Sequence, residues 1–209
     1  MIIQRVVAAV ATAFLATAAF SASAADAAKP EIGKPAPDFT ATDINGKTVK
    51  LSDYKGKIVV LESFNLGCPF CMGHFKSGGM QELQKDLTSK GVVWLMVNSV
   101  NAKHSNYKTP DQAKADWAKY KINATTEIQD TDGKVGHLYG MLTTPHMFVI
   151  DQNGILVYNG AIDDVSDNPD HDPRKARNYV KEAVGKVQAN EKVAVTETKP
   201  YGCSVKYAN

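Results

Sequence analysis

Two cysteines three positions apart are the residues in this sequence whose types and spacing most directly indicate chemistry. They form the stretch Cys68-Pro69-Phe70-Cys71. A short apolar segment rich in β-branched residues, 58–61, precedes them and indicates a buried strand. After the pair, the apolar residues adopt helical spacing as far as Gly91. The cysteines are therefore expected where a strand ends and a helix begins.

Such a position favours a reactive thiolate on Cys68. Unpaired backbone N–H groups and the positive end of the helix dipole stabilise negative charge there. They can bring a cysteine pKa from about 8.5 down to roughly 3.5–7.5. We expect Cys68 to be the exposed nucleophile and Cys71, one turn into the helix, to be the resolving thiol. An ordinary stabilising disulfide is the alternative, but closing so small a loop stabilises a protein little.

Metal chemistry is the second alternative for these cysteines. A zinc site needs two more ligands, and no second Cys/His pair has the spacing of a zinc finger. Met72 follows Cys71 where haem attachment would need a histidine. His74 and His146 are candidates to tune the thiolate or bind a metal, and Met72, Met141 and Met147 suit Cu(I). Because methionines also fill cores, we expect neither a metal nor another cofactor.

The first 24 residues are predicted to be a secretory signal peptide. Arg5 precedes an apolar segment, 6–20, and Ala22-Ser23-Ala24 resembles a cleavage site. The segment is shorter than the roughly 18 residues that span a membrane. We therefore expect a periplasmic or secreted protein with no stable membrane insertion after cleavage, in an oxidising compartment. The chain has 24 basic and 22 acidic residues, so no basic field indicates nucleic-acid binding.

Apolar periodicity and turn residues predict alternating strands and helices. Asn45-Gly46 indicates a hairpin between two short strands. A mixed α/β sheet with helices on both faces accounts for this order. The predicted strands are 39–44, 47–51, 58–61, 92–97, 126–129, 146–150 and 155–159. The predicted helices run from the cysteines to Gly91 and over 110–120, 134–139 and 174–188, and the segment 189–209 has no clear period.

Several motifs together resemble the redoxin group of thioredoxin-fold proteins, the alkyl-hydroperoxide-reductase and thiol-specific-antioxidant superfamily. They are the opening Ile32-Gly33-Lys34-Pro35-Ala36-Pro37-Asp38-Phe39, Tyr54-Lys55-Gly56-Lys57, the two-cysteine motif and Thr144-Pro145. The segments 143–151, 160–164 and 202–206 resemble a peroxiredoxin-like subgroup. This resemblance implies a thioredoxin-like fold with a central mixed sheet. The expected division is a signal peptide at 1–24, a redoxin domain at 25–189 and a C-terminal tail at 190–209.

The resemblance also assigns roles to individual residues. Glu62 is expected to lie buried beneath the cysteines and accept a proton from Cys71, with a pKa raised by burial. Pro145 is expected to be cis, with the Thr144 backbone free to pair with a substrate strand. Pro69, Phe70 and Thr144 are the implied substrate-binding residues. Cys203 could resolve Cys68, pair with a partner or remain a free thiol.

These features favour a thiol–disulfide oxidoreductase that acts on a disulfide-containing protein or a thiol substrate with a thiol electron donor. A peroxiredoxin-type peroxidase, in which Cys68 forms a sulfenic acid, is the alternative. Against it, Asn65 replaces the Thr or Ser that such peroxidases carry three positions before the reactive cysteine. After the signal peptide only Arg174 and Arg177 remain as arginines. A copper-binding assembly factor using both cysteines and a histidine is the third hypothesis.

Overall fold

The computed structural model describes residues 30–208. The predicted signal peptide lies outside the described residues. No helix within the described part of the chain is long and apolar enough to cross a membrane.

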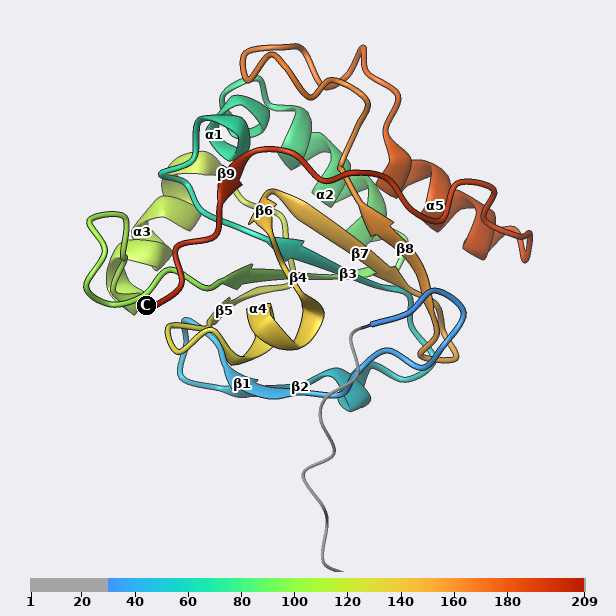
Figure 1. The fold of residues 1–209 in the computed structure, drawn as a ribbon, viewed down its shortest axis with the longest axis horizontal. Coiled ribbons are helices and arrows are strands. Elements are labelled where there is room, and N and C mark those ends of the chain that lie inside the picture. The colour runs from blue at the N-terminus through green and yellow to red at the C-terminus, as the bar shows by residue number, and fades with distance from the viewer. Residues whose placement is uncertain (1–29, 209) are drawn as a thin grey trace, which may run out of the picture.

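A five-stranded mixed sheet forms the centre of the fold (Figure 1). Its order is β5-β4-β3-β7-β8, with β3, β4 and β5 parallel and with β7 antiparallel to β3 and to β8. Every residue of β3, β4 and β7 is buried, as expected for strands covered on both faces. The strands are β3 (Val59–Ser63), β4 (Val93–Asn98), β5 (Thr126–Gln129), β7 (His146–Ile150) and β8 (Leu156–Gly160).

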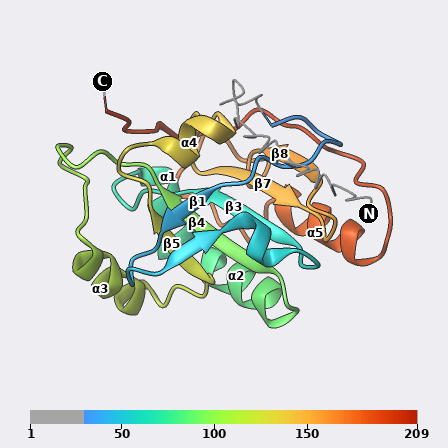
Figure 2. The same cartoon turned by 90° about the horizontal axis from the view of Figure 1, so that it is seen from below.

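The two faces of this sheet carry different layers. Side chains alternate along β3, so Val60 packs with one cluster and Leu61 with the other. The Val60 cluster includes residues of α2 (Gly79–Ser89), α5 (Tyr179–Gln188) and α1 (Pro69–Lys76), with α3 (Pro110–Tyr120) packed against it. The opposite cluster includes α4 (Lys134–Tyr139), the hairpin of β1 (Thr40–Thr42) and β2 (Thr48–Lys50), and η1 (Leu51–Tyr54). Figure 2 shows these layers from below. The predicted thioredoxin-like fold, with a central mixed sheet and helices on both faces, is confirmed.

Two helix boundaries differ from the prediction. The helix expected from the cysteines to Gly91 is broken into α1 and α2, because Gly78 adopts a left-handed φ of +84° between them. The last helix begins at Tyr179 rather than at residue 174. Its N-cap is Asn178, whose side-chain oxygen accepts the Lys181 backbone N–H at 2.8 Å, so the helix starts after this residue.

The segment after α5 runs back across the molecule and forms a short strand near the end of the chain. This strand, β9 (Cys203–Ser204), pairs antiparallel with β6 (Thr143–Thr144), as Figure 1 shows. Further along, Tyr207 stacks on His137 with the ring centroids 3.9 Å apart. Neither strand of this pair was predicted, because two-residue strands have no periodicity to detect.

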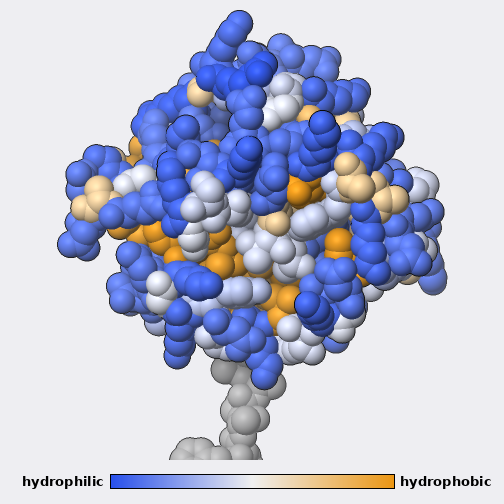
Figure 3. All heavy atoms as spheres, turned by 180° about the vertical axis from the view of Figure 1, so that it is seen from behind, coloured by the Kyte–Doolittle hydropathy of each residue, from blue (hydrophilic) through white to orange (hydrophobic). Residues whose placement is uncertain are grey.

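The surface is dominated by hydrophilic side chains. Seen from behind, hydrophobic residues gather only in patches between them (Figure 3). Among the large hydrophobic residues of the described part of the chain, 30–208, Leu142 stands out as exposed, at 65 %, and it lies two residues before Thr144.

Candidate active site

The two-cysteine motif occupies the junction between β3 and α1, as predicted. Cys68 is the N-cap of α1, and Pro69 follows in the first turn. The preceding turn is held by Asn65, whose backbone oxygen accepts the Cys68 N–H at 3.0 Å and whose side chain accepts the Gly67 N–H at 2.8 Å. Proline suits this position, because the first N–H groups of a helix have no partner within it. The thiol of Cys68 is thus held at the positive end of the helix.

Cys68 is buried, with only 1 % of its surface exposed, so the prediction of an exposed nucleophile is wrong. Its thiol donates a hydrogen bond to the backbone oxygen of Thr144 at 2.9 Å. The Thr144–Pro145 peptide bond is cis, which confirms the prediction for Pro145. The fold therefore brings together the motif and a loop 76 residues further along the chain.

The two cysteines of the motif differ in acidity. The neighbouring Cys71 thiol is the largest cause of a lowered pKa of Cys68, to about 4, and Cys203 contributes, while burial opposes the shift. Burial and the neighbouring Cys68 raise the pKa of Cys71 well above its usual range. Cys68 is therefore the more acidic of the two, and Cys71 keeps its proton to higher pH. A difference of this kind suits an attacking and a resolving cysteine.

Glu62 lies on β3, in register with Met96 of β4 and Met147 of β7. It is fully buried, and its Oε2 accepts the Trp94 indole N–H at 2.7 Å. Its Oε1 is buried without a hydrogen-bond partner. Burial raises the pKa of Glu62 to about 8, and its charge in turn raises the pKa of Cys71. A carboxyl of this kind can accept and release a proton near neutral pH.

Within residues 30–208, neither Asn65 nor the two arginines are arranged around Cys68 as peroxide-activating groups. The Asn65 side chain is used to hold the turn before the helix. Arg174 is half exposed and pairs with Asp172 and Glu82, while Arg177 pairs with Glu182. Asn65 and the two arginines therefore depart from the peroxidase pattern in the structure as they do in the sequence.

The two histidines singled out in the sequence both belong to buried networks. His146 Nδ1 accepts the Leu142 backbone N–H at 3.2 Å, so Nε2 is the protonated nitrogen that contacts Asn159 Oδ1 at 2.7 Å. Neither nitrogen of His146 remains for a metal. His74 faces Asp163, and burial lowers the pKa of His74 to about 4. Met141 and Met147 pack in the two hydrophobic clusters.

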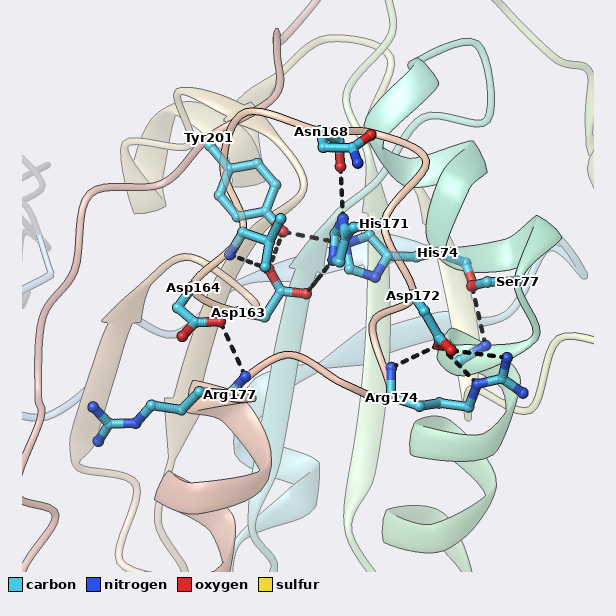
Figure 4. Close-up of polar contacts among 12 residues, drawn as sticks. His74, Ser77, Asp163, Asp164, Asn168, His171, Asp172, Arg174, Arg177 and Tyr201 are labelled. Atoms are coloured by element: carbon cyan, nitrogen blue, oxygen red, sulfur yellow. Dashed lines mark hydrogen bonds and ion pairs between the residues drawn. The ribbon is translucent and has the colours of Figure 1, made fainter.

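His74, Asp163, His171 and Tyr201 form a buried polar cluster that the sequence did not indicate (Figure 4). Asp163 accepts hydrogen bonds from the Tyr201 hydroxyl, from His171 Nε2 at 2.8 Å and from the Val165 N–H at 3.1 Å. His74 Nε2 lies 3.3 Å from the Tyr201 hydroxyl. These residues come from α1, the loop after β8 and the C-terminal segment. No spacing in the sequence connects them, so only the fold reveals the cluster.

The C-terminal segment reaches the cysteines themselves. Cys203 is in register with Thr144 across the β6–β9 pair, and the ring of Tyr201 packs edge-on against Phe70, with centroids 5.7 Å apart. The expectation that the Thr144 backbone is free to pair with a substrate strand is therefore wrong. That position is filled by β9 of the same chain, whose arrival could not be inferred from an aperiodic segment.

Comparisons with known proteins agree with this geometry. Residues 32–159 match the AhpC/TSA family model. Thiol-disulfide oxidoreductase ResA of Bacillus thuringiensis subsp. konkukian is 31% identical over 127 residues, which cover 61% of this chain and 68% of that protein. Thiol:disulfide interchange protein DsbE of Pseudomonas fluorescens biotype C is 30% identical over 138 residues, with coverages of 64% and 70%.

Two solved structures share the fold over a larger part of the chain. A hypothetical protein from Sinorhizobium meliloti 1021 aligns with a TM-score of 0.73 at 22% identity, covering 85% of this chain and 95% of that one. An uncharacterized conserved protein from Geobacillus kaustophilus aligns with a TM-score of 0.73 at 24% identity, with coverages of 85% and 93%. At these identities the likeness shows the fold and nothing more.

Proposed function

We propose that this chain, which belongs to the AhpC/TSA family, is an exported enzyme that exchanges disulfides through the Cys68–Cys71 pair. Thiol–disulfide oxidoreductase activity is the chemistry of its relatives ResA and DsbE. The observation that carries the proposal is the placement of the two-cysteine motif at the start of α1, with the Cys68 sulfur 2.9 Å from the Thr144 oxygen of the cis-proline loop. The opposite shifts of the two pKa values, down for Cys68 and up for Cys71, agree with it.

In the proposed reaction the Cys68 thiolate attacks one sulfur of a substrate disulfide. The second substrate sulfur leaves as a thiolate, and a mixed disulfide joins Cys68 to the substrate. Cys71 then gives its proton to Glu62 and attacks the Cys68 sulfur. The first substrate sulfur leaves and takes up a proton, so the substrate is reduced to a dithiol and the enzyme holds a Cys68–Cys71 disulfide. A thiol electron donor returns the enzyme to its dithiol form.

The remaining site residues are proposed to bind the substrate. Pro69 and Phe70 adjoin the reactive sulfur, and Thr144 with the cis Pro145 supplies the facing loop. Leu142 offers an exposed apolar contact beside this loop, which suits a protein substrate. Pairing of a substrate strand with Thr144 requires β9 to leave first.

Export is proposed from the sequence of residues 1–24 together with the nature of the chemistry. In an oxidising compartment disulfides form and persist, so substrates for this chemistry would be present at a periplasmic or secreted location. We further propose that residues 25–189 form the redoxin domain and that 190–209 is an appended segment. The cysteines would then work in the compartment where disulfides persist.

The test is a disulfide-reduction assay on the chain, with insulin as the substrate and dithiothreitol as the donor. Cys68→Ser and Cys71→Ser are compared with the wild type, and hydrogen peroxide consumption is followed in parallel. Insulin reduction that requires both cysteines, without Cys68-dependent peroxide turnover, supports the proposal. Rapid peroxide consumption that requires Cys68 alone would instead assign the chain to the peroxidases.

A further inference from the structure

We propose that Cys203 is a third redox-active cysteine, which forms a disulfide with Cys68 while β9 is docked in the place of a substrate strand. The proposal rests on the nucleophilic role proposed for Cys68. It adds a second disulfide partner for that sulfur, contributed by a segment that is distant in the sequence.

The first support is the register and closeness of the β6–β9 pair. Cys203 faces Thr144, whose backbone oxygen accepts the hydrogen bond of the Cys68 thiol. The Thr144 hydroxyl donates in turn to the Cys203 backbone oxygen at 3.4 Å. Gly202 has a φ of +119°, and a Cβ there would lie 2.2 Å from the Thr144 oxygen. Only glycine allows this approach of the two backbones, so the segment is built to lie against the cis-proline loop.

The second support is the direction of the side chains along β9. Successive residues of a strand point to opposite faces. Ser204 is exposed and Cys203 is partly buried, so the Cys203 side chain is directed to the face of β9 that lies against the cis-proline loop and Cys68. Burial and the neighbouring Cys68 raise the pKa of Cys203 to about 11, and Cys203 in turn helps to lower the pKa of Cys68. These opposite shifts agree with two thiols that lie close to each other.

The third support is access. Cys68 and Cys71 are 1 % and 0 % exposed, whereas Cys203 is partly exposed. With β9 docked, Cys203 is the one cysteine that adjoins both the reactive sulfur and the solvent. Because Cys203 belongs to the same chain, it can form a disulfide with Cys68 without the binding or release of a substrate protein.

The strand is also fixed on both sides of Cys203. Two residues earlier, the Tyr201 hydroxyl donates to the buried Asp163 within the cluster of Figure 4. Beyond β9, the Val205 N–H bonds the Leu142 oxygen at 3.2 Å and the Lys206 oxygen accepts the Asn101 N–H at 2.9 Å. These contacts hold the Cys203 thiol at a defined place, which is the condition for fast intramolecular exchange.

The exchange balances within the chain. In the oxidised enzyme the Cys203 thiol loses its proton, and its sulfur attacks the Cys68 sulfur of the Cys68–Cys71 disulfide. A Cys68–Cys203 bond forms, the bond to Cys71 breaks, and the Cys71 sulfur takes up the proton. The number of disulfides is unchanged. The same attack on a mixed disulfide at Cys68 releases the bound thiol in place of Cys71.

The test uses the full chain carrying Cys71→Ser and one equivalent of 5,5′-dithiobis(2-nitrobenzoate). Attack by Cys68 releases one thionitrobenzoate and leaves the other in a mixed disulfide. Attack by Cys203 then releases the second. We expect two thionitrobenzoates per chain, a second phase whose rate is independent of protein concentration, and a Cys68–Cys203 linked peptide by mass spectrometry after digestion.

Two controls make the result specific. Cys71→Ser with Cys203→Ser should stop after one thionitrobenzoate. Adding Ser204→Cys to that double variant moves the thiol one residue along β9 to the opposite face, and the second phase should slow by roughly tenfold or more. Circular dichroism of each variant checks that it is folded, and Cys71→Ala repeats the measurement with a side chain that cannot donate a hydrogen bond.

Release that stops at one equivalent in the Cys71→Ser and Cys71→Ala chains overturns the role of Cys203 while leaving the proposed function intact. An equally fast second phase in the Ser204→Cys chain also overturns it, because any thiol on the segment would then suffice. If Cys68 releases no thionitrobenzoate at all, the nucleophile itself is wrong and both proposals fall.

Discussion

Cys68 lies between two thiols that the protein holds in different ways. Cys71 is one helical turn away on α1, fully buried, and fixed by the covalent geometry of the helix. Cys203 is partly exposed and comes from a two-residue strand near the end of the chain, held by one short ladder and a few anchoring contacts. The first partner cannot leave Cys68, whereas in our proposal the second is displaced at the cost of a few hydrogen bonds. The proposed active site thus combines a permanent partner with a removable one.

The largest expected effect is a difference between the Cys71 and Cys203 variants in the rate of insulin reduction. Cys71→Ser should reduce the rate of insulin reduction by about a thousandfold, because resolution is then left to an external thiol or to Cys203, whose strand must first dock again beside Cys68. Cys203→Ser should change the rate only a few-fold, because β9 must leave before a protein substrate binds. Steady-state assays of the two single variants measure the difference.

The double variant sharpens this comparison. If Cys203 can resolve part of the mixed disulfide, Cys71→Ser with Cys203→Ser should be slower than Cys71→Ser alone. Equal rates for these two chains would contradict a contribution from Cys203 during turnover. Equal losses in the two single variants would remove the distinction between a permanent and a removable partner.

The next effect concerns Glu62, the proposed proton acceptor of Cys71. Glu62→Gln should slow the resolution step by roughly a hundredfold, because Cys71 loses its proton acceptor. Stopped-flow decay of a mixed disulfide at Cys68 measures this step. Its rate in the wild type should rise with pH through about 8, as Glu62 loses its proton. In Glu62→Gln this rise should be absent.

The same substitution has a signature in stability. Glu62 titrates near 8 in the folded protein and at about 4.3 when unfolded, so between these values only the folded state binds the proton. Wild-type stability should therefore fall as the pH rises from about 5 to 8, by up to about 1.4 kcal/mol per pH unit from this residue. Relative to wild type, Glu62→Gln should gain stability over that range in denaturant titrations. A difference that does not vary with pH would contradict the raised pKa.

Local patterns predicted the strand, the two-cysteine motif and the following helix of the permanent part of this site, whereas the burial of Glu62 was predicted through the family resemblance. The change to helical spacing after Cys71 is visible in the sequence. Asn45-Gly46 marked the hairpin, and the ranges of β5, β7, α3 and α4 agree with the prediction. Each of these features depends on neighbouring residues, whose pattern a single sequence records.

The removable part depends on contacts between distant residues and was not predictable. Nothing near Cys203 indicates that it pairs with Thr144, and nothing near Asp163 indicates Tyr201 or His74. The expected exposure of Cys68 was wrong for the same reason, since the segment that reaches it is aperiodic. The cis form of Pro145 was predicted only through the family resemblance, because an X-Pro bond by itself favours trans.

The acidity of Cys68 offers a third test of the comparison. Both neighbouring thiols lower its pKa, and Cys71 is the larger cause. The pKa of Cys68 should therefore rise in both Cys71→Ala and Cys203→Ala, and it should rise more in Cys71→Ala. Rates of iodoacetamide alkylation against pH, with the labelled residue identified by mass spectrometry, give these values. The opposite order would make Cys203 the dominant partner of the thiolate.

The smallest effect concerns how firmly the removable partner is held. Tyr201→Phe deletes the hydroxyl that donates to Asp163 but keeps the ring against Phe70. Loss of about 1 kcal/mol of anchoring should favour the undocked state of β9 by about fivefold. In a Cys71→Ser background, the second thionitrobenzoate phase should slow, and amide exchange of Cys203 and Ser204 should quicken.

Tyr207→Phe is the matched control, because the Tyr207 hydroxyl donates to the neutral Met141 backbone oxygen at 2.9 Å on the other side of β9. Hydrogen bonds to charged groups stabilise more than neutral ones, so this variant should loosen β9 less than Tyr201→Phe does. If both substitutions loosen β9 equally, the buried cluster around Asp163 has no special part in holding Cys203. If neither does, the strand is held by its backbone ladder and by the close contact at Gly202 alone, and Cys203 is less removable than the comparison with Cys71 implies.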